Sequence, residues 1–130
     1  MRRLALLVLL PAVLVPAACG TSAPSYSLDR TRACIEDSGM AVTKPAGDFV
    51  AQSATVGAFR AYLEGRRGNF VTASFGENAD EAADTVLGYE RFHGENVGLS
   101  DILFSDRNVV MLWKEHPSDE EAARVTGCLS

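Results

Sequence analysis

The clearest pattern along the chain is the alternation of apolar and polar residues in GAFRAYLEGRRGNFVTASFG. A period of two is typical of half-buried strands, and Gly65 and Gly68 favour a turn between them. We therefore predict a β-hairpin over residues 57–76.

In the next stretch, ENADEAADTVLGYERFHG, the apolar residues follow helical spacing. Asn78 as N-cap, with Glu81 three residues later, predicts a helix that ends at Gly94.

The same order of patterns then recurs. VGLSDILFSDRNVVMLWKEH predicts a second hairpin with its turn at SDRN, and PSDEEAARVTGCLS predicts a second helix. Ser118 is its expected N-cap, and Glu121 its third helical residue. A shift of 40 residues, which places Glu81 on Glu121, superposes the two units without a gap. Residues 57–96 and 97–130 therefore predict a repeated ββα unit.

A shorter helix is expected before the repeat. SLDRTRACIEDSGM has Ser27 as a possible N-cap and Gly39 at a position typical of a helix end. The following AVTKPAGDFVAQSA is predicted to be irregular, with a short edge strand at Phe49 and Val50. The expected fold class is α+β: an N-terminal helix, then ββαββα, with a four-stranded, mainly antiparallel sheet and helices on one face.

Counting by twos assigns the side chains of the hairpins to two faces. The inner set is apolar throughout: Phe59, Ala61, Leu63, Val71, Ala73, Phe75, Leu99, Leu103, Val109, Met111 and Trp113. The outer set of the first unit is polar: Arg60, Tyr62, Glu64, Thr72 and Ser74. The outer set of the second unit is apolar: Ile102, Phe104, Val110 and Leu112. Such a face needs cover, so either the first helix covers it or it is a contact surface.

The N-terminal residues follow a different pattern. Arg2 and Arg3 precede an apolar run that extends from Leu4, and the run ends in AACG. This layout is typical of a secretory signal peptide, and the run is too short for a membrane-spanning helix. The AACG stretch resembles the lipobox of bacterial lipoproteins, in which the cysteine is lipidated and the leader is cut just before it. Pro16 differs from that family's usual Leu, Val or Ile, which leaves ordinary secretion as the alternative.

The lipobox resemblance implies that Cys19 carries acyl chains, palmitate among them, and anchors the protein on the extracytoplasmic side of the cell membrane. Residues 1–18 would be the signal peptide, residues 19–27 the lipidated cysteine with its tether, and residues 28–130 a single domain. Of the three cysteines, Cys34 and Cys128 then remain. In an oxidising compartment they are expected to pair, which would contribute about 4–5 kcal/mol for so long a loop. Two buried free thiols are the alternative.

Charge and candidate chemistry narrow the function classes. The chain has 12 basic and 17 acidic residues, a net charge of −5, which disfavours a nucleic-acid partner. His93 and His116 do not correspond under the shift of 40 residues, so they do not predict a repeated site. Most carboxylates lie at helix starts, where capping explains them. No pattern indicates a serine nucleophile, a metal site or a cofactor.

Three functions follow from these observations. The leading prediction is a non-enzymatic, lipid-anchored extracytoplasmic domain that either binds an unknown ligand or partner or has a structural role in an envelope assembly. The second is a small hydrolase-type enzyme that uses His93 or His116 with a carboxylate. The third is a carrier for an apolar ligand, held beside Ile102, Phe104, Val110 and Leu112.

Overall fold

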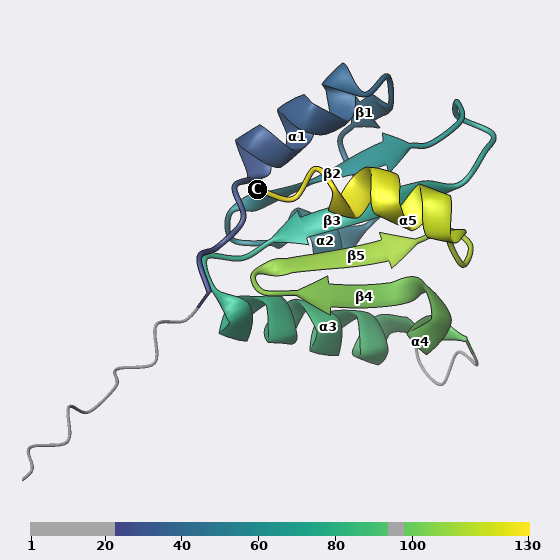
Figure 1. Cartoon of the computed structure of the whole chain (residues 1–130). Helices are drawn as coiled ribbons and strands as arrows, with labels where there is room; N and C mark the ends of the chain where they lie inside the picture. The colour runs from purple at the N-terminus through teal and green to yellow at the C-terminus, as the bar shows by residue number, and fades with distance from the viewer. Residues whose placement is uncertain (1–22, 94–97) are drawn as a thin grey trace, which may run out of the picture.

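A computed structural model describes residues 23–93 and 98–130. The described residues form a five-stranded antiparallel sheet in the order β1-β2-β3-β5-β4, with helices on both faces (Figure 1). The strands are β1 (Ala41–Thr43), β2 (Gly57–Tyr62), β3 (Phe70–Phe75), β4 (Leu103–Asp106) and β5 (Val109–Trp113). The helices are α1 (Leu28–Asp37), α2 (Phe49–Gln52), α3 (Ala79–His93), α4 (Leu99–Ile102) and α5 (Asp119–Thr126). The α+β class is therefore confirmed.

The three helix starts predicted from capping residues are confirmed. The Ser27 hydroxyl accepts the N–H of Arg30 at 3.3 Å at the start of α1. Ser118 and Glu121 form the complete reciprocal pair at the start of α5. Asn78 Oδ1 accepts the N–H of Glu81 at 3.1 Å, but the Glu81 carboxylate bonds the N–H of Glu77 rather than that of Asn78. All these bonds span at most four residues, which explains why the sequence was sufficient to predict them.

The sheet has a fifth strand where an irregular segment was expected, and the edge strand predicted at Phe49 and Val50 is wrong. Strand β1 pairs with β2 through residues 41–43, and Phe49 begins α2. The reason for the helix lies in Asp48, whose Oδ1 accepts the N–H of Ala51 at 2.9 Å. This N-cap bond stabilises the start of α2. The short apolar run of residues 49–51 is by itself compatible with either a helix or a strand.

The prediction that all helices lie on one face is also wrong. Helices α1 and α5 pack on one face of the sheet, whereas α2 and α3 pack on the other (Figure 1). The strand order explains the position of α3. Strands β3 and β4 are both antiparallel to β5 and lie on either side of β5. They are therefore parallel to each other, and α3 lies in the connection between them. Such a crossover is almost always right-handed, and the right-handed path carries α3 over the face opposite α5.

The two ββα units do not superpose as the ungapped repeat predicted. Their helix starts keep the shift of 40 residues, but their hairpins differ. The first hairpin pairs Tyr62 with Phe70, whereas the second pairs Asp106 with Val109 across the two-residue turn Arg107–Asn108. If the two units were related by a twofold rotation, the axis that exchanges the antiparallel strands β3 and β5 would be perpendicular to the sheet. Such a rotation does not exchange the faces of the sheet, so α3 and α5 would lie on the same face. The opposite faces of α3 and α5 therefore exclude a rigid twofold repeat.

The tight second turn also changes the assignment of faces in β4. Leu103 pairs with Leu112, and Phe104 pairs with Met111. Cross-strand partners share a face, so Leu103 lies on the α2/α3 face and Phe104 on the α1/α5 face, the reverse of the prediction. Leu99 lies on α4 rather than in a strand. The predicted faces of β2, β3 and β5 are confirmed, because Phe59, Ala73 and Met111 lie in one core.

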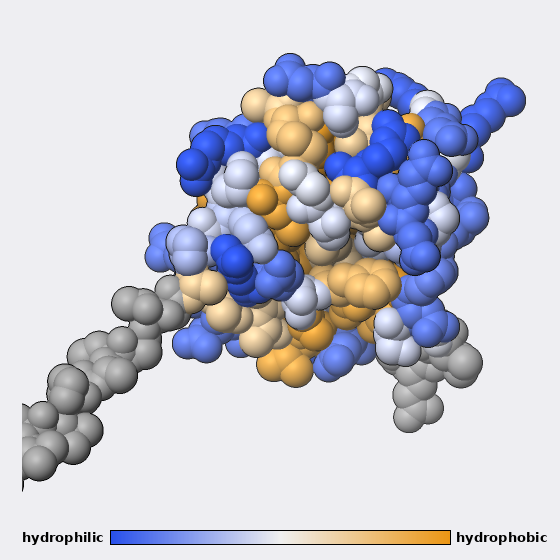
Figure 2. All heavy atoms as spheres, viewed as in Figure 1, coloured by the Kyte–Doolittle hydropathy of each residue, from blue (hydrophilic) through white to orange (hydrophobic). Residues whose placement is uncertain are grey.

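The core of the α1/α5 face is apolar. It contains Ile35, Met40, Phe59, Ala61, Leu63, Val71, Ala73, Phe75, Val109, Met111, Trp113, Val125 and Cys128. Figure 2 shows this face from outside: hydrophobic side chains are visible in the middle of the domain and extend to its lower edge, with hydrophilic side chains mainly at the sides and the top. The predicted disulfide joins Cys34 of α1 to Cys128 after α5, with 5.4 Å between the Cα atoms. It links the two helices that cover this face.

The α2/α3 face is more polar, and it is not open to solvent as the outer set of the first unit predicted. Thr72 and Ser74 are each 1 % exposed beneath the helices. A smaller apolar cluster, centred on Ala82, Tyr89 and Val110, joins α3 to the sheet. Gly88 lies where a Cβ would come within 3.2 Å of Val50 Cγ1, so its lack of a side chain lets α2 approach α3.

The second hairpin turn holds the start of the described chain. The Asn108 side chain is buried, accepts the N–H of Tyr26 at 2.7 Å, and donates to the carbonyl groups of Tyr26 and Gly76. Arg107 donates to the Pro24 carbonyl at 3.1 Å, and its guanidinium lies 4.6 Å from the centre of the Tyr26 ring. Residues 24–26 are therefore tied to the folded domain beside the turn between β4 and β5.

Candidate functional site

A cavity of about 430 Å³ opens on the α2/α3 face, beside the start of β3 and the end of β5. Its volume lies within the range of small-molecule sites. Its wall combines α2, the end of α3, α4 and the sheet. The lining residues are Gly47, Asp48, Phe49, Val50, Arg60, Phe70, Thr72, Tyr89, Phe92, Ile102, Leu112, Trp113 and Lys114. Most of them are apolar or aromatic, and two are cations.

Two phenylalanines on the wall of this cavity are largely exposed. Phe49 of α2 is 80 % exposed and Phe92 of α3 is 78 % exposed. Both also line an adjoining cavity of about 400 Å³ on the α2/α3 side. Exposed aromatic side chains beside a hollow are typical of binding surfaces, because a bound partner would remove their apolar area from water.

Arg60 supplies the polar part of the cavity from strand β2. Its Nε donates to the Thr72 hydroxyl across the β2–β3 pair, at a long distance of 3.4 Å. Its guanidinium lies 4.5 Å from the centre of the Phe70 ring. The side chain is half-buried, and no carboxylate within residues 23–93 and 98–130 forms an ion pair with it. An arginine placed in this way can bind a carboxylate or phosphate in a planar, two-pronged arrangement.

Tyr89 and Asp48 join α3 to α2 at the bottom of the cavity. The Tyr89 hydroxyl donates to Asp48 Oδ2 at 2.9 Å, and Tyr89 is 1 % exposed. Burial, and then the neighbouring Asp48 carboxylate, raise the pKa of Tyr89 far above its usual value. Tyr89 therefore stays protonated at ordinary pH, and its role is that of a hydrogen-bond donor rather than a base.

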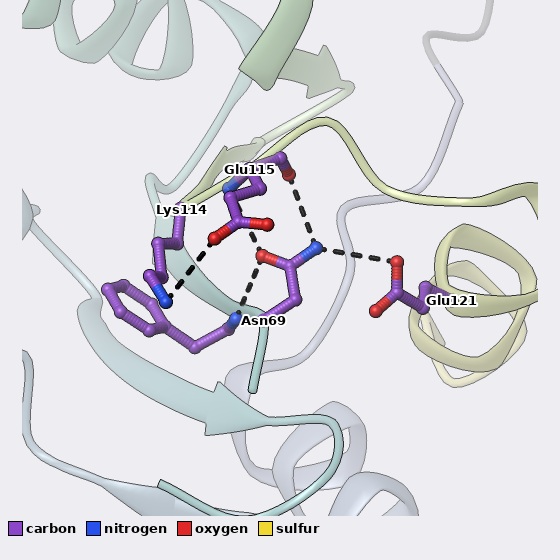
Figure 3. A network of polar contacts seen from close by, with 5 residues as sticks. Asn69, Lys114, Glu115 and Glu121 are labelled. Atoms are coloured by element: carbon purple, nitrogen blue, oxygen red, sulfur yellow. Dashed lines mark hydrogen bonds and ion pairs between the residues drawn. The ribbon is translucent and has the colours of Figure 1, made fainter. Parts of the chain in front are cut away.

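Lys114 lies at the edge of the cavity, next to a network centred on Asn69 (Figure 3). Asn69 Oδ1 accepts the N–H groups of Phe70 and Glu115, and its Nδ2 donates to the Glu115 carbonyl and to Glu121 of α5. Lys114 pairs with the exposed Glu115 at 3.4 Å. The network holds the start of β3 against the end of β5, and so positions Phe70 and Lys114 beside the cavity.

The four residues predicted as a contact surface are separated by the structure. Ile102 and Leu112 line the cavity. Val110 is fully buried under α3 rather than under the first helix, and Phe104 lies on the opposite face. Helix α3 thus covers Val110, and Ile102 and Leu112 form part of the cavity wall.

Of the two predicted histidines, His116 is not among the described residues that line the cavity. His116 is exposed before α5, its Nδ1 lies 2.6 Å from the Asp101 carbonyl, and its ring centre is 6.4 Å from that of Phe104. The side chain of His93 and the whole of Cys19 lie outside the described residues. In the part of the chain that the structure describes, no group of three His, Cys, Asp or Glu residues is placed to hold a metal ion.

No helix among the described residues is long and apolar enough to cross a membrane. No protein-family model matches the chain, and neither a curated protein nor a solved structure matches it.

Sequence reasoning missed the residues that give this site its character. Arg60 and Thr72 were assigned to a solvent-facing surface because α3 was placed on the other face. Asp48 and its neighbour Phe49 are distant in sequence from Tyr89, and the two segments meet only after folding. The sequence holds the two aromatic residues Phe49 and Phe92, but a pattern of strands and helices alone does not connect them.

Proposed function

We propose that this protein is an extracytoplasmic, lipid-anchored binding domain that holds a small molecule with an apolar tail in the 430 Å³ cavity. The cavity itself carries this proposal, because it unites apolar walls with two exposed phenylalanines and a half-buried arginine. The leading prediction of a binding domain and the alternative of an apolar-ligand carrier are thereby combined in one site.

The membrane anchor is proposed from the sequence, and the disulfide supports the extracytoplasmic location that it implies. The lipobox-like AACG places the acyl chains on Cys19, and the Cys34–Cys128 disulfide suits an oxidising compartment. Pro24 already contacts the domain through Arg107. The five residue steps from Cys19 to Pro24 span at most ~18 Å, so the domain would remain close to the membrane surface. An amphiphilic ligand is abundant in that setting.

The titratable groups of the cavity favour binding over catalysis. Asp48 is occupied, since one oxygen caps α2 and the other accepts the Tyr89 hydroxyl. The raised pKa keeps Tyr89 protonated. His116 is absent from the residues that line the cavity. The enzyme alternative based on His93 or His116 stays a prediction, and no contact of the described residues favours it.

Photolabelling tests the binding site. The full chain, purified with its anchor and placed in phosphatidylcholine nanodiscs, is irradiated with a diazirine derivative of decanol. The expected label, mapped by mass spectrometry, falls on peptides that contain Phe49, Phe92 or Ile102, and excess decanol suppresses it. Ile102→Trp, which fills the cavity, should remove most of the label. Leu99→Trp on the same helix α4 is the matched control, because Leu99 lines a different cavity.

Equal labelling of the two variants, or label confined to other peptides, would reject the cavity as the binding site.

The membrane anchor is tested separately. Cys19→Ala should leave the protein unprocessed or release it from the membrane fraction, as measured by fractionation and intact-mass analysis. Fully processed Cys19→Ala protein that stays in the membrane would contradict lipidation.

A further inference from the structure

We propose that the ligand of this cavity carries a single anionic head group, a carboxylate or a phosphate, and that Arg60 binds it. The inference rests on the proposed function, since it names the chemical class of the ligand for the same site. The shared chemistry is an anionic head on an apolar tail.

The position of Arg60 carries the first step. Its guanidinium is held on one side by the Phe70 ring, at 4.5 Å, and at Nε by the Thr72 hydroxyl, at 3.4 Å. These two contacts orient the planar group, and neither uses its two terminal nitrogens. Arg60 is half-buried and forms no ion pair within residues 23–93 and 98–130, so its guanidinium has lost part of its hydration, and an anion that enters the cavity would restore the missing interaction.

The other charged groups of the cavity strengthen the assignment to Arg60. Of the described residues that line the cavity, Asp48 is the one carboxylate, and both of its oxygens already accept hydrogen bonds. Among the described residues, Asp48 and Arg60 do not form an ion pair. Lys114 is the second cation, but it is 41 % exposed and pairs with Glu115. Its contribution to anion binding is expected to be smaller, because exposed pairs are screened by water.

The apolar part of the wall fits the rest of such a ligand. Val50, Ile102 and Leu112 present aliphatic side chains, and Phe49 and Phe92 extend the apolar surface to the outside. A tail that lay against them would bury apolar area, while the head lay against the face of β2 at Arg60. A neutral apolar ligand would leave the Arg60 terminal nitrogens unpaired inside a partly dehydrated site.

Calorimetric titration of the full chain in phosphatidylcholine nanodiscs tests the inference, with empty nanodiscs as the blank. The ligands are decanoate, decyl phosphate, decanol and decylammonium. At least one of the two anions should bind about tenfold tighter than decanol, since one hydrogen-bonded charge corresponds to that ratio or more. A preference for decanoate would indicate a fatty-acid-like ligand, and a preference for decyl phosphate would indicate a lipid-phosphate head.

The matched variants locate the effect. Arg60→Gln should abolish the preference for the anion over decanol, while Arg60→Lys should keep part of that preference. Arg67→Gln, in the exposed turn of the first hairpin, should behave as the unmodified protein. Thermal melts confirm that each variant is folded.

Two outcomes overturn the anionic head while leaving the binding site intact. In one, decanol or decylammonium binds as tightly as both anions. In the other, Arg60→Gln weakens all four ligands equally, which would make Arg60 a structural residue of the wall. Failure of all four ligands to bind would instead reject the proposed function together with the inference.

Discussion

The two faces of the sheet are covered in different ways. On the α1/α5 face, the strands present apolar side chains, and a disulfide joins the two covering helices. On the α2/α3 face, the central strands present Arg60, Thr72 and Ser74, and the covering helices are joined by the Tyr89–Asp48 hydrogen bond. The first face carries the larger hydrophobic core. The second encloses apolar and polar groups around a cavity.

Under the proposed function, stability and ligand binding belong to different sides of one small sheet. A small domain has little apolar area to bury, so one face has to be closely packed. The disulfide adds to the stability of that face by restricting the unfolded chain. The other face can then keep a hollow and a cation without an ion pair among the described residues. Each of the following changes tests one side of the comparison.

The largest loss of unfolding free energy is expected from Val110→Asp. This variant tests whether water is excluded between the sheet and α3 as it is from the core on the opposite face. Val110 is fully buried between β5 and α3. An unpaired carboxylate there should cost about 4 kcal/mol or more of unfolding free energy, enough to unfold a small domain. Chemical denaturation followed by circular dichroism measures it. Ser105→Asp is the control, because Ser105 is the exposed cross-strand partner of Val110 and should change stability by about 0.5 kcal/mol or less.

A smaller effect is expected from removal of the disulfide. The double variant Cys34→Ser with Cys128→Ser should lose about 2–5 kcal/mol of unfolding free energy, because the unfolded chain gains freedom. Thermal and urea unfolding with and without reductant measure the loss. The reductant should lower the stability of the unmodified protein and leave that of the double variant unchanged. Alkylation of Cys34 in the denatured, unreduced protein would contradict the bond.

The smallest effect is expected from Tyr89→Phe, which removes the link between α2 and α3. The loss of one hydrogen bond to a carboxylate should cost about 1–2 kcal/mol at neutral pH, measured by urea unfolding. Tyr62→Phe is the control, since the Tyr62 hydroxyl makes no hydrogen bond to another described residue. A loss of the same size in Tyr62→Phe would show that the Asp48 contact is not the cause.

The same variant has a distinct dependence on pH. The folded protein raises the pKa of Tyr89 above the ordinary 10.0, so the folded state keeps a proton that the unfolded state releases. The stabilisation from Tyr89 is therefore complete below pH 10 and declines as the pH rises beyond it. Tyr89→Phe should lack this part of the alkaline decline. Parallel declines in both proteins above pH 10 would contradict the buried Tyr89–Asp48 contact.

Local features account for the predictions that were confirmed. The helix starts at Ser27, Asn78 and Ser118 depend on side chains that bond backbone groups three residues away. The first hairpin follows from alternation around GRRG. The disulfide followed from the count of cysteines once Cys19 was assigned to the lipid. The cavity was only partly anticipated: Ile102 and Leu112 were singled out as apolar, whereas Arg60 was placed in solvent.

By itself, the sequence determined the α+β class, the helix starts, the first hairpin, the inner faces of β2, β3 and β5, and the pair Cys34–Cys128. These depend on neighbours in sequence or on a period of two. Only the tertiary structure decided that β1 joins the sheet, that Phe49 lies on a helix, and that α3 covers the face opposite α5. The physical reason is that an amphipathic helix can pack on either face of a sheet, and strand order together with crossover handedness selects one. That choice created the cavity, because it brought Tyr89 and Phe92 of α3 to the same face of the sheet as Arg60.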